Sequence, residues 1–392
     1  MKNRSLLMIP GPVEFEPAVL AAMGEPTTSH LDAGFIEAFS QALQDLRWIF
    51  DSPTGQPLVL AGSGTLAMDC AGANLVEPGD KALVVDTGYF SERFAQILQR
   101  YGALVTRVTA PPRSRPSLEQ VKSALEADAF KLMTITHVDT STAIIAEVEQ
   151  LAQLGKQYGC LVVVDGVCSV AGETLKMDDW NVDLALTASQ KAIGVPPGLA
   201  LLMLGPRVME AFQKRTTPVL NYYADWSNWL PIMQAYEARK PSYFGTPPVN
   251  LIFALHVSLG QILAEGLLRR TARHIAISQA CKAGIQALGL TQVPLQPEYA
   301  AHTLTAPRYP VGVNGQEFLA KVLQAGVTLA GGLLPSIRGE YFRIGHMGAV
   351  TLGDVLATIS AIETALLGCG YEFTPGIGVE TARSQGKNFL NT

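Results

Sequence analysis

The sequence predicts an α/β protein with a mostly parallel sheet in a large domain, followed by a smaller α+β domain. Strand and helix patterns alternate along the first half of the chain, which is typical of parallel sheets with right-handed crossovers. The 392 residues are too many for one small core and suit two domains. We expect an N-terminal segment over residues 1–16, the large domain over 17–258 and the small domain over 259–392.

Apolar spacing predicts the individual elements. Residues 35–50 have the period of an amphipathic helix. Residues 218–249 are rich in Trp, Tyr and Pro without a clear period, so we expect a long functional loop there. The other expected elements are strands over 57–60, 81–85, 130–136 and 161–165, a helix over 146–158, a helix over 252–274 that leaves the large domain, strands near 304–306 and 341–344, and helices near 316–325 and 353–367.

Composition excludes several classes of protein. Hydrophobic residues make up 48% and charged residues 16% of the chain, as in a well-buried globular enzyme. The net charge is −5 without a basic stripe, so we expect neither nucleic acid nor a membrane as partner. Five scattered cysteines without a Cys-x-x-Cys pair argue against a disulfide framework and against a metal site. Since no segment reads as a signal peptide or membrane span, we expect a cytoplasmic protein, with the peroxisome as the alternative location.

One lysine and one aspartate stand where a cofactor could use both. Lys191 follows the apolar segment 184–188 in a region with almost no other charge, and Asp165 ends the apolar run 161–164. If these runs are neighbouring parallel strands, both side chains emerge at the sheet edge where ligands bind. A desolvated lysine can form a Schiff base, and a carboxylate can keep a pyridinium nitrogen protonated. The pair therefore predicts an enzyme that uses pyridoxal 5′-phosphate (PLP).

A glycine-rich turn supplies a candidate phosphate site. The Gly-Ser-Gly-Thr turn at 62–65 follows the expected strand 57–60 and opens a helix expected over 66–75. Free backbone N–H groups and the helix dipole would face an anion there. The turn is also compatible with a dinucleotide, because Asp86 lies about where a ribose-binding carboxylate could stand. A nucleotide-binding oxidoreductase is therefore an alternative, although it assigns no role to the lysine and the aspartate.

Further strand ends carry residues suited to a ring and a carboxylate. Tyr89 and Phe90 follow the second expected strand, and an aromatic ring there could stack on a cofactor. The segment 136–143 gathers more hydroxyl groups than a helix cap requires, and we expect its His137 to be structural. Arg343 lies in an otherwise apolar strand, and its planar guanidinium can hold a carboxylate in a bidentate pair.

These motifs resemble the class V, fold-type I PLP aminotransferases, in particular the alanine–glyoxylate aminotransferases of the fungal type. The resemblance extends over nearly the whole chain and implies a seven-stranded, mostly parallel sheet and a homodimer with shared active sites. The similar segments are Ile-Pro-Gly-Pro at 9–12, Ala-Gly-Ser-Gly-Thr at 61–65, Thr-His-Val-Asp-Thr-Ser-Thr at 136–142, Val-Asp-Gly-Val-Cys-Ser at 164–169, Ala-Ser-Gln-Lys at 188–191 and Phe-Arg-Ile-Gly-His-Met-Gly at 342–348.

The resemblance also implies roles for single residues. Lys191 would form the internal aldimine with PLP, and Asp165 would bind the pyridinium nitrogen. The substrate contacts would be Arg343 and Gly11. The other cofactor contacts would be Ser63, Gly64, Thr65 and Gln190 at the phosphate, Phe90 stacked on the ring, Ser141 through its hydroxyl, and Tyr243 and Thr246 at the phosphate of the neighbouring subunit.

The implied reaction moves the amino group of L-alanine to glyoxylate by a ping-pong mechanism and gives pyruvate and glycine. Serine–pyruvate or serine–glyoxylate transamination is the nearest alternative, because a small pocket that accepts alanine rejects an added hydroxyl poorly. A cysteine desulfurase would have a histidine where Gln190 stands. No second arginine stands out to neutralise a distal carboxylate, so we expect aspartate and glutamate to be poor donors. Arg338 is the residue that could overturn this expectation.

Overall fold

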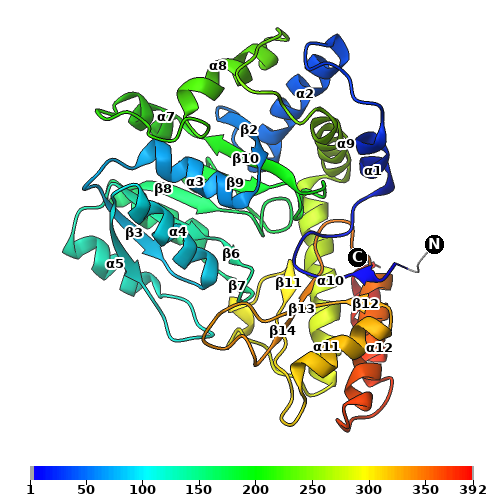
Figure 1. Ribbon diagram of the computed structural model, residues 1–392. Coiled ribbons are helices and arrows are strands. Elements are labelled where there is room, and N and C mark those ends of the chain that lie inside the picture. The colour runs from blue at the N-terminus through cyan, green and yellow to red at the C-terminus, as the bar shows by residue number, and fades with distance from the viewer. Residues whose placement is uncertain (1–3, 391–392) are drawn as a thin grey trace.

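The computed structural model describes residues 4–390, and its centre is a seven-stranded sheet (Figure 1). Only β10 runs antiparallel to its neighbours, which are β2 and β9. The mostly parallel sheet expected from the sequence is therefore confirmed. In their order across the sheet, the strands are β2 (Gln56–Gly62), β10 (Gly198–Leu204), β9 (Leu184–Ala188), β8 (Leu161–Asp165), β5 (Leu132–Thr136), β3 (Lys81–Val85) and β4 (Leu104–Val108).

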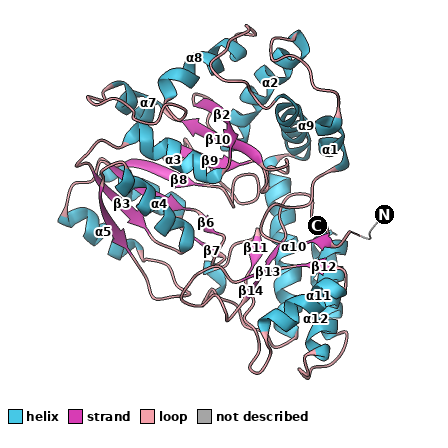
Figure 2. Cartoon of the chain, in the orientation of Figure 1, coloured by secondary structure: helices cyan, strands magenta, loops and turns pink. Residues whose placement is uncertain are grey.

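Helices cover both faces of this sheet (Figure 2). Asp32 begins one of them, because its carboxylate accepts hydrogen bonds from the backbone N–H groups of Gly34 and Phe35. The helices up to residue 265 are α1 (Pro17–Gly24), α2 (Ala33–Phe50), α3 (Gly64–Leu75), α4 (Tyr89–Arg100), α5 (Leu118–Ala127), α6 (Val148–Gln157), α7 (Pro206–Gln213), α8 (Trp226–Glu237) and α9 (Val249–Glu265).

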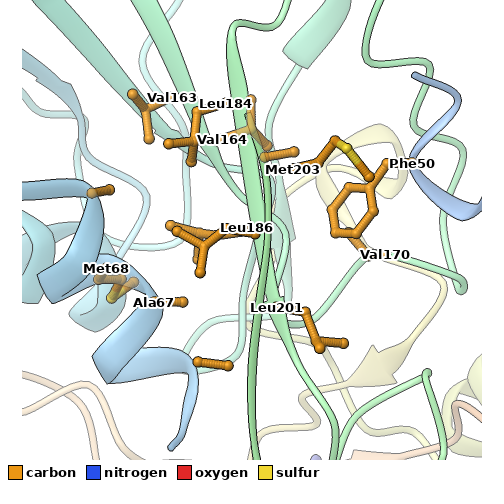
Figure 3. Packing of buried hydrophobic residues seen from close by; sticks show 14 of the residues in the cluster. Phe50, Ala67, Met68, Val163, Val164, Val170, Leu184, Leu186, Leu201 and Met203 are labelled. Carbon is orange, nitrogen blue, oxygen red and sulfur yellow. The ribbon is translucent and has the colours of Figure 1, made fainter. Parts of the chain in front are cut away.

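The central strands are apolar throughout because both of their faces are covered. Every residue of β5, β8 and β9 is buried, which explains why these strands read as continuous apolar runs rather than as alternating ones. Figure 3 shows Ala67 and Met68 of α3 on one side of the strands, near Leu186, and Phe50 and Val170 on the other side.

The C-terminal part has its own hydrophobic cluster, to which Met8 from the N-terminal segment also belongs. It contains a three-stranded sheet in the order β11, β14, β13. The limits expected for the domains, at residues 16 and 258, stay predictions. The elements here are α10 (Leu267–Ala287), the 3₁₀-helix Pro297–Tyr299, β11 (Leu304–Thr305), α11 (Gly315–Gln324), β13 (Ala330–Gly331), β14 (Phe342–Gly345), α12 (Leu352–Gly368) and α13 (Ile377–Leu390); β1 (Leu6–Leu7) pairs with β12 (Val327–Thr328), and β6 (Val138–Asp139) pairs with β7 (Ile144–Ile145).

Two expected elements are wrong. The helix expected over 252–274 is two helices, α9 and α10, which meet at an angle of 86° at Gly266. Gly266 has a φ of 82°, a conformation that glycine adopts without strain. No single helix of residues 4–390 is long and apolar enough to cross a membrane. The bent pair α9 and α10 meets the requirement for a membrane span by its length and composition alone.

The loop expected over 218–249 contains the helix α8. Asp225 begins this helix by accepting a hydrogen bond of 2.8 Å from the backbone N–H of Ser227. Its apolar period was hidden because Trp226, Trp229, Leu230, Ile232, Met233 and Tyr236 are all buried, and because Pro231 lies inside the helix. The assignment as a loop therefore failed where a helix is buried on several sides.

Candidate active site

The C-terminal ends of the parallel strands meet at one edge of the sheet, as ligand sites of open α/β sheets do. β2, β8 and β9 end there at Gly62, Asp165 and Ala188, and a cavity of about 130 Å³ opens beside them. The structure brings seven of the expected site residues to this cavity: Ser63, Gly64, Thr65, Phe90, Asp165, Gln190 and Lys191. Residues separated by more than 120 positions in the sequence thus form one site.

Lys191 is buried between the end of β9 and the beginning of β10. Its Nζ donates a hydrogen bond to the carbonyl oxygen of Pro10, so the N-terminal segment covers the amine. Gly11 lies against the same side chain, because a Cβ there would come within 2.6 Å of Nζ. Burial lowers the pKa of Lys191, and a lowered pKa favours the neutral amine that a nucleophile or base requires.

Asp165 is 2% exposed at the end of β8. Its Oδ1 accepts a hydrogen bond of 3.0 Å from the backbone N–H of Val167. Burial raises the pKa of Asp165 to about 7, and the negative charge of Asp139 acts in the same direction. No cationic side chain of residues 4–390 forms an ion pair with Asp165. A cationic group in the cavity would therefore stabilise the ionised carboxylate.

The turn at the start of α3 is open to an anion. Ser63 stands at the N-cap position, but its hydroxyl makes no capping hydrogen bond and is left for a ligand. A Cβ at Gly64 would lie 2.7 Å from Cγ2 of Val167, so only glycine fits where the turn meets the loop after β8. Gln190 brings a buried Oε1 atom that has no hydrogen-bond partner within residues 4–390. These polar groups converge on the same end of the cavity.

Asp86 does not face this cavity. Its carboxylate is paired with Arg107 and accepts a hydrogen bond of 3.1 Å from the backbone N–H of Gly88. The carboxylate on which the dinucleotide alternative depends is therefore engaged elsewhere. His137 fits the structural role expected for it, since burial lowers its pKa to about 4 and leaves the ring uncharged at neutral pH.

Phe90 lines the cavity from the first turn of α4, but Ser141 does not line it. The Ser141 hydroxyl donates a hydrogen bond of 2.6 Å to Asp139 and accepts one of 3.1 Å from the backbone N–H of Tyr89. Asp139 also accepts a hydrogen bond of 2.9 Å from the backbone N–H of Phe90. Asp139, which the sequence reasoning missed, therefore fixes α4 behind the Phe90 ring. Its Asp-x-Ser spacing, typical of a local side-chain turn, was the available signal.

Arg343, in β14, does not line the cavity itself but contacts a residue that does. Its Nε donates to the carbonyl oxygen of Gly331 at 2.9 Å, and its Nη1 donates to that of Thr140 at 3.1 Å. Thr140 itself lines the cavity. Burial lowers the pKa of Arg343, and no carboxylate of residues 4–390 is paired with it. A guanidinium held in place by carbonyl groups, with its charge unpaired, is suited to bind a ligand carboxylate.

Tyr243 and Thr246 lie outside the cavity. The Tyr243 side chain is 62% exposed, and Thr246 lines a different small cavity beside Tyr223 and Trp229. The structure of one chain therefore does not bring these two residues to the site that Lys191 occupies.

Comparison with known proteins identifies the class to which this fold and site belong. The class-V aminotransferase family matches residues 18–334, and the chain belongs to that family. Alanine–glyoxylate aminotransferase 1 of Saccharomyces cerevisiae is 40% identical over 88% of this chain and 93% of its own. L-Aspartate–glyoxylate aminotransferase of Paracoccus denitrificans is 32% identical over 98% of this chain and 96% of its own. The crystal structure of alanine–glyoxylate aminotransferase from Nostoc sp. superimposes with a TM-score of 0.88 and 32% identity, covering 93% of this chain and 95% of the other.

The chain is thus a fold-type I aminotransferase that depends on PLP. The residues present fit this cofactor at both of its charged ends. Asp165 offers a buried carboxylate without a cationic partner, and the turn at Ser63 and Gly64 offers free donors to a phosphate. The match to the class-V aminotransferase family, rather than to a nucleotide-binding oxidoreductase, decides against the oxidoreductase alternative.

Proposed function

We propose that this enzyme transfers the amino group of L-alanine to glyoxylate, producing pyruvate and glycine. The observation that carries the proposal is that the partly buried guanidinium of Arg343, which has no carboxylate partner among residues 4–390, donates a hydrogen bond to the backbone of Thr140, a residue that lines the cavity of Lys191. Alanine and glyoxylate each carry one carboxylate, so one such group satisfies both substrates. The yeast relative named for alanine and glyoxylate supports the same pair.

The side chains of this chain divide the chemistry among them. PLP, when bound, supplies an electron sink for the charge that develops at the substrate Cα. Arg343 binds the carboxylate of the amino or keto acid and so orients Cα. Nζ of Lys191, whose pKa is lowered by burial, would carry the proton that leaves Cα of the amino acid to the cofactor, and in the second half of the reaction would carry a proton from the cofactor to Cα of the new amino acid. Asp165 holds a proton on the ring nitrogen by charge, and the segment at Pro10 and Gly11 shields the amine from water.

An absorbance experiment tests the reaction. Alanine added to the purified PLP-loaded enzyme is expected to remove the visible band of the lysine-bound cofactor, and glyoxylate added afterwards is expected to restore it. Pyruvate and glycine should be formed in equal amounts. If alanine leaves the band unchanged while another amino acid removes it, alanine is not the donor.

Serine is the second candidate donor, because a pocket that accepts the methyl group of alanine discriminates only weakly against an added hydroxyl. Initial rates with alanine and with serine, each at several concentrations with glyoxylate as acceptor, decide between the two. A kcat/KM for serine well above that for alanine would assign the enzyme to serine.

We also propose that two chains form a homodimer in which Tyr243 and Thr246 of one chain complete the phosphate site of the other. Their exposure and their separation from the Lys191 cavity support this arrangement. Lys191→Ala and Thr246→Arg proteins should each be inactive, the second because its bulk blocks the site of the neighbouring subunit. Verified mixed dimers should regain about half of the wild-type activity, since one of their two sites is intact. Mixed dimers without activity would show that Thr246 does not serve the neighbouring site.

A further inference from the structure

Arg93 is a cation at the edge of the cavity that neither the substrate site nor the lysine requires. It lies in α4 one turn after Phe90, and its guanidinium carbon is 4.8 Å from the centre of the Phe90 ring and 5.0 Å from that of Tyr89. Its Nη1 donates a hydrogen bond of 2.9 Å to Oγ1 of Thr65, in the first turn of α3. Arg93 therefore joins the ring that lines the cavity to the turn that is open to an anion.

The charge of Arg93 is unbalanced in the protein alone. No carboxylate of the described chain, residues 4–390, forms an ion pair with it. The guanidinium also stands beside the N-terminus of α3, where the helix dipole places about half a positive charge. Two positive groups side by side repel each other unless an anion lies between them. The same end of the cavity carries the free hydroxyl of Ser63.

We propose that Arg93 binds the phosphate group of PLP. The guanidinium offers further N–H donors besides the one used by Thr65, and it can approach a phosphate oxygen in a bidentate pair. Because the Thr65 hydroxyl accepts a hydrogen bond from Arg93, its own proton is free to be donated to the phosphate. Arg93 thus contributes both a direct contact and the orientation of a neighbouring donor. The inference rests on the cofactor placement proposed above, with the phosphate at the start of α3.

A comparison of PLP with pyridoxal, which lacks the phosphate, tests this role without measuring activity. Equilibrium binding of each compound to apo-protein is followed by absorbance for the wild type and for Arg93→Gln. We expect Arg93→Gln to weaken PLP binding by roughly tenfold or more, as for a lost charge-assisted hydrogen bond, and to leave pyridoxal binding unchanged. Equal losses for both compounds would overturn the proposal, because Arg93 would then act only through the Phe90 ring.

Two further variants separate the possible causes of a change in binding. Arg100→Gln removes the same charge from an exposed position at the end of the same helix, and it should leave the affinity of PLP relative to pyridoxal as in the wild type. Ser63→Ala removes a donor from the proposed phosphate site. A phosphate-selective loss in Ser63→Ala but not in Arg93→Gln would overturn the role of Arg93 and leave the cofactor placement intact. No selective loss in either variant would overturn both.

Arg93→Lys keeps the charge and removes the planar fork. We expect its preference for PLP over pyridoxal to be smaller than that of the wild type and larger than that of Arg93→Gln. Thermal unfolding of each apo-protein verifies that it is folded. If Arg93→Gln fails to fold, the comparison is made with Arg93→Lys, and an unchanged preference for PLP in that variant overturns the proposal.

Discussion

Asp165 should lower the free energy of unfolding of the apo-enzyme as the pH rises toward 7, and Asp165→Asn should remove this loss of stability. The buried carboxyl has its pKa raised from 3.8 to about 7 in the folded chain. As the pH rises from 3.8 to 7, the unfolded chain releases this proton while the folded chain keeps it, so the free energy of unfolding falls. Above pH 7 the carboxyl is ionised in the folded and in the unfolded chain, and the loss in the free energy of unfolding is complete.

The magnitude follows from the part of this window that lies above pH 5. Two pKa units at about 1.4 kcal/mol each amount to about 3 kcal/mol lost by the wild type between pH 5 and pH 8. Asparagine has nearly the same shape, stays uncharged and can still accept the hydrogen bond from the backbone N–H of Val167. Asp165→Asn should therefore lack this loss and be the more stable apo-protein at pH 8.

Urea unfolding of PLP-free protein at pH 5 and pH 8 measures the effect, with the difference between the two pH values compared for wild type and variant. The same pH dependence in both proteins would refute the reasoning, because Asp165 would then titrate normally in the folded state. With PLP bound, the wild type should be more stable than Asp165→Asn at pH 8, since a neutral amide cannot hold the ring proton by charge. Turnover by Asp165→Asn should accordingly fall far below that of the wild type.

Three other substitutions and one substrate test address the remaining groups. Lys191→Ala should abolish turnover and the band of lysine-bound PLP while still binding the cofactor, as absorbance and equilibrium dialysis would show; wild-type turnover would contradict its role. Arg343→Lys should raise KM for alanine and glyoxylate, with a cost toward the lower end of about 2–5 kcal/mol because a charge remains; unchanged KM values would remove Arg343 from the site. Gly11→Ala should displace the lysine, because the added Cβ would lie 2.6 Å from Nζ and φ is 130°; an unaltered absorbance spectrum would contradict this. Aspartate should be a poor donor despite the relative named for it, unless the exposed Arg338 binds its second carboxylate.

The sequence was sufficient to place the lysine and the aspartate because local pattern and sheet topology agree there. Each follows or ends a short apolar run, and in a parallel sheet such runs end at the same edge. The register confirms the geometry, since Asp165 pairs with Leu186, two residues before the end of β9. Such residues can be found without a structure because their neighbours in sequence determine where they point.

Other parts of the site depend on packing between distant elements, and local pattern does not record it. Arg93 becomes part of the site only because α4 lies beside the start of α3, where its guanidinium meets Thr65. Ser141 was expected to contact the cofactor, yet its hydroxyl is used by Asp139 and by the backbone of α4. The bend at Gly266 and the helix α8 were missed for the same kind of reason. The helix α8 is buried on several sides and so has no apolar period in the sequence. The bend depends on the conformation of a single residue, Gly266, which a periodic pattern does not reveal.

The charges of the site have a common physical property, which is that the protein alone leaves them unsatisfied. Asp165 is buried and forms no ion-pair contact, although the charge of Lys191 acts on it, and Arg343 and Arg93 have no carboxylate partner among the described residues. For the buried Asp165 the absence of an ion-pair partner costs free energy, and at all three positions a ligand of complementary charge can bind without displacing a partner from the protein. A pyridinium nitrogen matches Asp165, a phosphate matches Arg93, and the carboxylate of the amino acid matches Arg343. Because each partner belongs to a different part of the bound molecules, the spacing of the three charges fixes the direction in which the cofactor and its substrate lie across the edge of the sheet.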